Sequence, residues 1–264
     1  MTRQRWMRSL SVATAAFVVW AVTGQASALM AGASTGEGGW PGGPVLRVEA
    51  DHGFLDRGLT CTGTLIAPTW VVTAQHCTNV GRAPGHPYRP RDLTVRVDQP
   101  VAVDEVYRMG GYDAGSLVND VALLRLSTPV TSVTPARIAE TPLRSASGAQ
   151  VYGFGGPSAA MHAADVRVTS RAVVNEGPCL FPTGSLTFVT SVHGGSSQGD
   201  SGGPLLAWQG DVPLLQTVTA GAADRETCGL PSLQARPESW VGISNRVDRA
   251  STAWAFLSAH VPGL

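Results

Sequence analysis

The chain of 264 residues contains no lysine, and charged residues make up only 14% of it. Ordinary soluble domains carry about 25% charged residues. The low value excludes coiled coils, disordered acidic segments and proteins that bind nucleic acid through charge. The sequence also has no C-x-x-C pair, no histidine-rich cluster and no evident calcium loop. We therefore expect no metal and no cofactor.

The first 28 residues have the pattern of a signal peptide. Arg3, Arg5 and Arg8 precede an uncharged, largely apolar stretch over residues 10–23, and Ala26-Ser27-Ala28 fits a signal-peptidase site. The apolar stretch is shorter than the roughly 18 residues that indicate a membrane span. The sequence thus predicts a secreted, extracellular protein with no membrane association after cleavage of residues 1–28. An uncleaved membrane anchor is the alternative.

The chain after this leader is rich in turn-forming residues, and glycine (31) and proline (18) separate short apolar runs. Such runs at close spacing predict an all-β fold, a barrel or a sandwich. Residues 248–260 alone resemble a helix, with Asp248 as the N-cap. A Thr-, Ser- and Pro-rich segment over residues 127–147 resembles a linker between two similar halves. The predicted strands cover residues 45–48, 60–66, 70–74, 93–97, 121–126, 149–154, 166–174, 186–191, 204–208, 214–219 and 241–247.

Three short segments carry reactive side chains in the order His, Asp, Ser. They are Thr73-Ala74-Gln75-His76-Cys77, Asn119-Asp120-Val121-Ala122-Leu123-Leu124 and Gly199-Asp200-Ser201-Gly202-Gly203-Pro204. The first two are ordinary patterns on their own, whereas the third is much rarer. Together they resemble the chymotrypsin-like (trypsin-like) serine protease family, and the resemblance covers essentially the whole chain after the leader. Gln75 departs mildly from the family, which usually has alanine there.

The resemblance implies two packed antiparallel six-stranded β-barrels with a short C-terminal α-helix. We expect an N-terminal barrel over residues 29–140 and a C-terminal barrel with the helix over residues 141–264. It implies that Ser201 is the nucleophile of an acyl-enzyme mechanism, that His76 is its base and that Asp120 orients His76. Imidazole suits this role because it exchanges a proton near neutral pH. The N–H groups of Gly199 and Ser201 would form an oxyanion hole, and a side chain at Gly199 would obstruct the substrate carbonyl.

Asp200 is implied to bind a new N-terminal amine, as it does in the family. Cleavage after Ala28 would expose Leu29-Met30-Ala31-Gly32, which is similar in shape and polarity to the usual Ile-Val-Gly-Gly start. Signal peptidase would then generate the activating amine without a separate zymogen step. In the alternative, the N-terminus is frayed and local N–H groups satisfy Asp200.

The four cysteines, an even number in an exported chain, indicate disulfides rather than metal ligands. The resemblance implies a Cys61–Cys77 bridge around the histidine. Cys179 and Cys228 then remain for a second bridge. That bridge departs from the family, which often has a cysteine where Ser197 stands.

The residue at the floor of the family's specificity pocket is Gly195 in this chain, and Thr219, Gly221 and Gly242 would form the walls. We expect an open, deep and uncharged pocket that prefers large apolar or aromatic residues before the scissile bond. A buried Arg or Lys side chain would lack a countercharge there. In the alternative, Asp224 or Glu226 folds back into the pocket and supports trypsin-like cleavage after Arg or Lys. We also expect Thr219 to face Asp120.

Two other functions compete with an active protease. Gly199–Gly203 also fits the G-x-S-x-G pattern of α/β-hydrolase esterases, but that fold needs a histidine after the serine and alternating strands and helices. A catalytically inactive binding protein on the protease scaffold is the second alternative. For the protease we expect a monomer whose partners are polypeptide substrates and protein protease inhibitors, with no nucleic acid.

Overall fold

Short strands form in this chain because each apolar run can bury one face. In β4 (Leu93–Arg96), Leu93 and Val95 are buried, whereas Thr94 is partly exposed and Arg96 is exposed. This alternation is the period of two that a strand imposes. The computed structural model describes residues 43–51, 58–82, 85–145, 147–156, 160–169, 184–191, 196–210, 212–224 and 240–264. The leader 1–28, Leu29, Cys179, Gly195, Glu226 and Cys228 lie outside these ranges.

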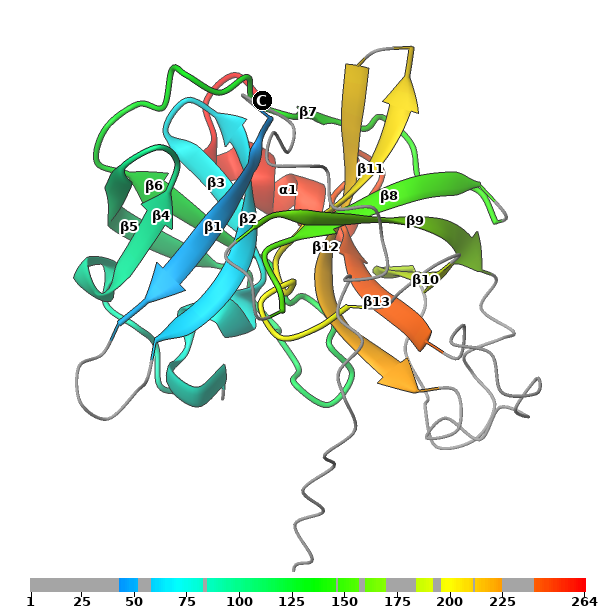
Figure 1. Ribbon diagram of the computed structural model, residues 1–264, viewed down its shortest axis with the longest axis horizontal. Coiled ribbons are helices and arrows are strands. Elements are labelled where there is room, and N and C mark those ends of the chain that lie inside the picture. The colour runs from blue at the N-terminus through cyan, green and yellow to red at the C-terminus, as the bar shows by residue number, and fades with distance from the viewer. Residues whose placement is uncertain are drawn as a thin grey trace, which may run out of the picture.

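Six strands close into a first barrel in the order β1-β2-β3-β6-β5-β4. Each neighbouring pair is antiparallel. The barrel forms one half of the molecule in Figure 1, coloured blue to green. The other strands are β1 (Val45–Ala50), β2 (Leu59–Ala67), β3 (Trp70–Thr73), β5 (Pro100–Arg108) and β6 (Ala122–Leu126).

A second barrel follows in the order β11-β8-β9-β10-β13-β12, and a β11–β12 pairing closes it. The short β7 (Arg137–Ile138) adds to β12 in parallel. The two-barrel fold that the sequence predicted is therefore confirmed. β7 precedes the expected domain boundary at residue 140 although it pairs with the second barrel, and that boundary stays a prediction. The strands are β8 (Gly148–Gly153), β9 (His162–Thr169), β10 (Leu186–Ser191), β11 (Pro204–Gln209), β12 (Val212–Asp224) and β13 (Trp240–Arg246).

The C-terminal helix α1 (Thr252–His260) returns to the first barrel (Figure 1). Ala253 and Leu257 are buried in the same apolar cluster as the first barrel's strands. The ring of His260 lies 4.6 Å from that of Tyr107 on β5. The helix thus ties the end of the chain to the first half.

The expected start of this helix was wrong. Ser251, not Asp248, is the N-cap, and its hydroxyl accepts a hydrogen bond from the N–H of Trp254. Asp248 is fully buried and binds the guanidinium of Arg246 at 2.8 Å instead. The carboxylate of Asp248 also accepts a hydrogen bond from the N–H of Ala250 at 3.1 Å, so it holds the turn that precedes the helix.

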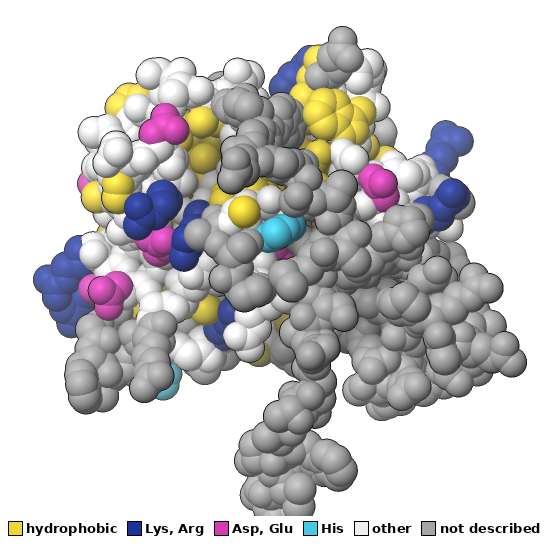
Figure 2. All heavy atoms as spheres, viewed as in Figure 1, with side chains coloured by type: hydrophobic (Ala, Val, Ile, Leu, Met, Phe, Trp, Pro, Cys, Tyr) yellow, Lys and Arg dark blue, Asp and Glu magenta, His cyan; other side chains and the backbone are white. Residues whose placement is uncertain are grey.

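In the described part of the first barrel, three short 3₁₀ turns lie between β3 and β4: η3 (Gln75–Thr78), η4 (Val80–Arg82) and η5 (Pro90–Asp92). In the part of the chain that the structure describes, no helix has the length and apolar character needed to span a membrane. On the face shown in Figure 2, charged side chains of both signs are scattered among uncharged ones.

Candidate active site

His76 and Asp120 meet because their strands are neighbours. β3 pairs with β6, with Thr73 opposite Ala122, so the residues just beyond β3 and just before β6 lie together. The N–H of His76 donates to Asp120 Oδ1 at 2.8 Å, and His76 Nδ1 lies 2.6 Å from Oδ2. Asp120 is completely buried. A carboxylate only accepts hydrogen bonds, so Nδ1 carries the proton and Nε2 keeps its lone pair for another partner.

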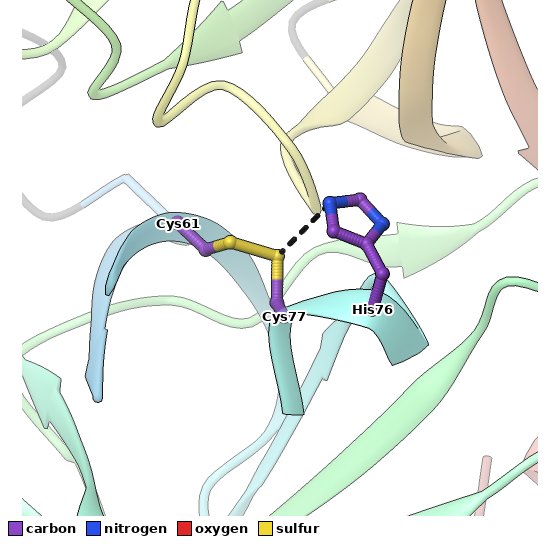
Figure 3. Close-up of side chains that lie close together, drawn as sticks. All are labelled: Cys61, His76 and Cys77. Carbon is purple, nitrogen blue, oxygen red and sulfur yellow. Dashed lines mark hydrogen bonds between the residues drawn. A yellow bond between two sulfur atoms is a disulfide. The ribbon is translucent and has the colours of Figure 1, made fainter. Parts of the chain in front are cut away.

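A disulfide between Cys61 on β2 and Cys77 on η3 holds the histidine segment (Figure 3). The expected pairing of these two cysteines is confirmed. Nε2 of His76 lies 3.7 Å from Cys77 Sγ, and that sulfur also lies 3.6 Å from the carbonyl oxygen of Ser201. The three side chains in Figure 3 are close enough to share a metal ion, but disulfide sulfurs offer no thiolate to zinc.

Main-chain hydrogen bonds from both barrels hold the loop of Ser201. The N–H of Thr62 on β2 donates to the carbonyl of Ser201 at 2.8 Å, and the N–H of Gly202 donates to the carbonyl of Thr219 on β12 at 2.7 Å. Gly202 has φ +83°, and a Cβ there would collide with the Thr62 carbonyl. The loop therefore needs glycine after the serine and depends on the packing of the two barrels.

The packing around Gly199 supplies its own reason for glycine at this position. Its φ is +107°, and a Cβ would lie 2.8 Å from Gly155 Cα and 3.1 Å from the Phe154 carbonyl. A side chain would thus strain the backbone and collide with the neighbouring main chain. The expected obstruction of a substrate carbonyl stays a prediction. Among the described residues, none accepts a hydrogen bond from the N–H of Gly199 or Ser201.

Asp200 is buried behind this loop, at 2% exposure. Its carboxylate accepts hydrogen bonds from the N–H groups of Gly155 and Ser197, both at 2.7 Å. Burial raises the pKa of Asp200, whereas those hydrogen bonds and the nearby His162 act to lower it. Local N–H groups therefore engage Asp200, and the expected amine of Leu29 lies outside the described residues.

A cavity of about 410 Å³ lies between the barrels, and His76 and Ser201 both line it. Of the expected pocket residues, Thr219 and Gly221 line this cavity, and Thr219 and Gly242 line a smaller one beside Asp200. Both Thr219 and Asp120 are described, and no hydrogen bond joins them. The main chain of Thr219 instead bonds to the serine loop.

Several residues of the cleft were missed by the sequence analysis. Arg82, Tyr112 and Leu117 line the cavity from the first barrel. Burial and the carboxylates of Asp120 and Asp113 raise the pKa of Tyr112 above its usual range, so its hydroxyl keeps its proton. No motif marks these positions, because their loops acquire a role only when the barrel brings them beside His76.

Non-glycine residues with a left-handed backbone conformation lie at the cavity and next to Asp120. In the described residues, the non-glycine positions with positive φ are Arg82 (62°), Leu117 (58°) and Asn119 (58°). Two of them line the cavity and the third precedes Asp120. Backbone conformations of this kind are costly for side-chain-bearing residues and cluster at functional sites.

Comparison with known proteins agrees with this geometry. The family model described as Trypsin matches residues 42–236. Serine protease SP24D of Anopheles gambiae is 31% identical over 166 residues, which cover 56% of this chain and 58% of the relative. The chain thus spans less than two thirds of that relative. In all, 88 curated proteins match the chain.

Proposed function

Because the chain belongs to the trypsin family of serine proteases, we propose that it is a catalytically active endopeptidase with Ser201 as the nucleophile. One observation carries the proposal. His76 is bound through Nδ1 to the buried Asp120, and its ring lines the same cavity as Ser201. The Nε2 lone pair is thereby left available on the side of the ring away from the carboxylate.

The proposed reaction follows the general Ser-His-Asp scheme of this family. Oγ of Ser201 attacks the substrate carbonyl while Nε2 of His76 accepts the hydroxyl proton. Asp120 holds the ring and stabilises the imidazolium that forms. The N–H groups of Gly199 and Ser201 donate to the oxyanion, and each such donor contributes about 3 kcal/mol of transition-state stabilisation. His76 then protonates the leaving amine, and water releases the acyl group.

The proposed substrate preference is for large apolar or aromatic residues before the scissile bond. Thr219 and Gly221 line the cavity that contains Ser201, Thr219 and Gly242 line the smaller one beside Asp200, and none of these three carries a negative charge that could pair with a substrate Arg or Lys. Asp200 is the one carboxylate lining the smaller cavity among the described residues, and two N–H groups already engage it. A chromogenic peptide panel tests this preference. Faster cleavage after Phe supports it, and faster cleavage after Arg favours the trypsin-like alternative.

Secretion also belongs to the proposal. Cleavage after residue 28 would release a monomer with two barrel domains, over residues 29–140 and 141–264, open to polypeptide substrates and protein inhibitors. A bridge between Cys179 and Cys228 is part of the same proposal. N-terminal sequencing of the secreted, active protein should give Leu29. A start several residues further on would contradict activation by signal peptidase.

Labelling with a fluorophosphonate probe separates an active protease from an inactive scaffold. The wild type should take up the probe, and Ser201→Ala should not. Ser258→Ala, which changes an exposed serine on α1, serves as the matched control and should label like the wild type. A folded wild-type protein that does not react would favour the inactive binding protein.

A further inference from the structure

Arg82 lines the cavity beside His76 without an acidic partner. It ends η4, which begins two residues after the turn that carries His76. Its side chain is partly buried, and it forms no ion pair with any described residue. A cation that loses water without gaining an anion is an unfavourable arrangement, which an incoming carboxylate would relieve.

The two carboxylates that act on Tyr112, which lines the same cavity as Arg82, are already engaged. Asp120 holds His76, and Asp113 accepts hydrogen bonds from the N–H of Gly115 and the hydroxyl of Ser116. Burial lowers the pKa of Arg82, and the only opposing influence comes from the phenol of Tyr88. None of the described residues that line the cavity therefore neutralises the charge of Arg82.

The backbone points to the same conclusion. Gly81 and Arg82 both adopt left-handed φ values, 61° and 62°, in a turn closed by a hydrogen bond from the Arg82 N–H to the Asn79 carbonyl at 3.0 Å. Glycine would adopt this conformation without strain, whereas arginine does not. The chain nevertheless has a long cationic side chain at this position, on the wall of the cleft.

We propose that Arg82 is a specificity-determining residue that binds an acidic side chain of the substrate within a few residues of the scissile bond. A guanidinium suits this task because it can bind a carboxylate through two parallel hydrogen bonds. The inference rests on the proposed proteolytic function and adds to it a second chemical preference, separate from the uncharged pocket.

Paired peptide substrates test the proposal. They are acetylated and amidated at their ends, keep phenylalanine directly before the scissile bond, and differ only by Glu, Gln or Lys at one other position, scanned from three residues before the bond to two after it. At one position the wild type should cleave the Glu peptide about tenfold faster in kcat/KM. Arg82→Gln should bring that ratio to about one, and Arg82→Glu should favour Lys over Gln. Arg137→Gln removes an exposed arginine from β7 and should leave the ratio unchanged.

Each outcome decides the proposal. If neutral peptides are cleaved but no position favours Glu, or the preference persists in Arg82→Gln, the subsite is wrong while the protease function stands. If no peptide is cleaved and no fluorophosphonate reacts, the proposed function fails. Calorimetric binding of the same peptides to Ser201→Ala, with and without Arg82→Gln, then decides the subsite alone. Thermal unfolding of every variant confirms that it is folded.

Discussion

The hydroxyl of Thr62 donates a 2.7 Å hydrogen bond to the carbonyl of Gly199, a residue 137 positions later in the chain. The same oxygen accepts a hydrogen bond from the N–H of Phe154 at 3.0 Å. One threonine on β2 of the first barrel therefore fixes two segments of the second. The geometry of the proposed oxyanion hole depends on both barrels.

Thr62→Val should lower both stability and turnover. It leaves the Gly199 carbonyl and the Phe154 N–H without their partner in a buried place, which costs about 1–3 kcal/mol. Because the loop of Ser201 then loses one anchor, kcat should fall more than KM rises. Denaturant unfolding and steady-state kinetics measure the two effects. Thr94→Val, at a partly exposed position of β4, should change neither, and an unaltered kcat in Thr62→Val would refute the coupling.

Gly199→Ala should impair the protease far more than an alanine at another left-handed glycine. The added Cβ meets Gly155 Cα at 2.8 Å, so the loop must shift and the N–H of Gly199 with it. Loss of one oxyanion donor lowers kcat by about 10²–10³. Gly210→Ala is the matched control, since φ is +60° there but nothing lies within 4 Å of the added atom. It should cost about 1 kcal/mol of stability and leave kcat intact. Equal kcat losses in both variants would show that the collision is irrelevant.

Asp200 should make stability fall as pH rises. Its folded-state pKa is raised by burial above 3.8, so the native state holds the proton more tightly than the unfolded chain. The resulting stability is complete at pH values below 3.8 and is lost as pH rises through the raised pKa. The difference in unfolding free energy between the wild type and Asp200→Asn should therefore decrease over that range. This prediction is for the chain that still carries its leader, in which Leu29 has no free amine, and a difference that increases with pH in that chain would contradict it. In the chain that begins at Leu29, an increase would instead support the proposed pairing of its amine with Asp200.

Replacing Cys61 and Cys77 together by alanine should lower the free energy of unfolding by about 3 kcal/mol in the chain-entropy model, for a separation of 16 residues. Activity should fall as well, because Cys77 follows His76 directly and its sulfur contacts both His76 and Ser201. Chemical denaturation and peptide hydrolysis measure the two effects. A double variant with wild-type stability would show that the bridge contributes nothing to the fold.

The strands that could be predicted are those whose own residues form an alternating or nearly continuous apolar pattern. β4 alternates apolar and polar side chains, and β6 is a buried apolar run interrupted by the partly exposed Arg125. β5 could not be found in this way because it begins at Pro100 and a register shift between Val103 and Glu105 breaks its alternation. Its place is set by the strands on either side.

The motif residues of the site were predictable, and the contacts that hold them were not. Ser201 lies in a rare short-range pattern, whereas His76 and Asp120 lie in ordinary patterns that became informative through the order His, Asp, Ser along the chain. The roles of Thr62 and Gly155 arise from contacts between distant parts of the chain, and single positions carry no trace of such contacts. The collision that a side chain at Gly199 would cause could not be predicted for the same reason, since Gly155 becomes its neighbour only when β8 and β11 pair.

The most direct test of the account is trapping of the acyl-enzyme. The protein is mixed with a nitrophenyl ester of an N-acylated phenylalanine at about pH 5, where deacylation by a histidine base is slow, and its intact mass and peptide map are measured. The account predicts a mass increase of one acyl group on Ser201 that is absent in Ser201→Ala and strongly reduced in His76→Gln. A folded wild-type protein with no added mass, or with the acyl group on another residue, would contradict it.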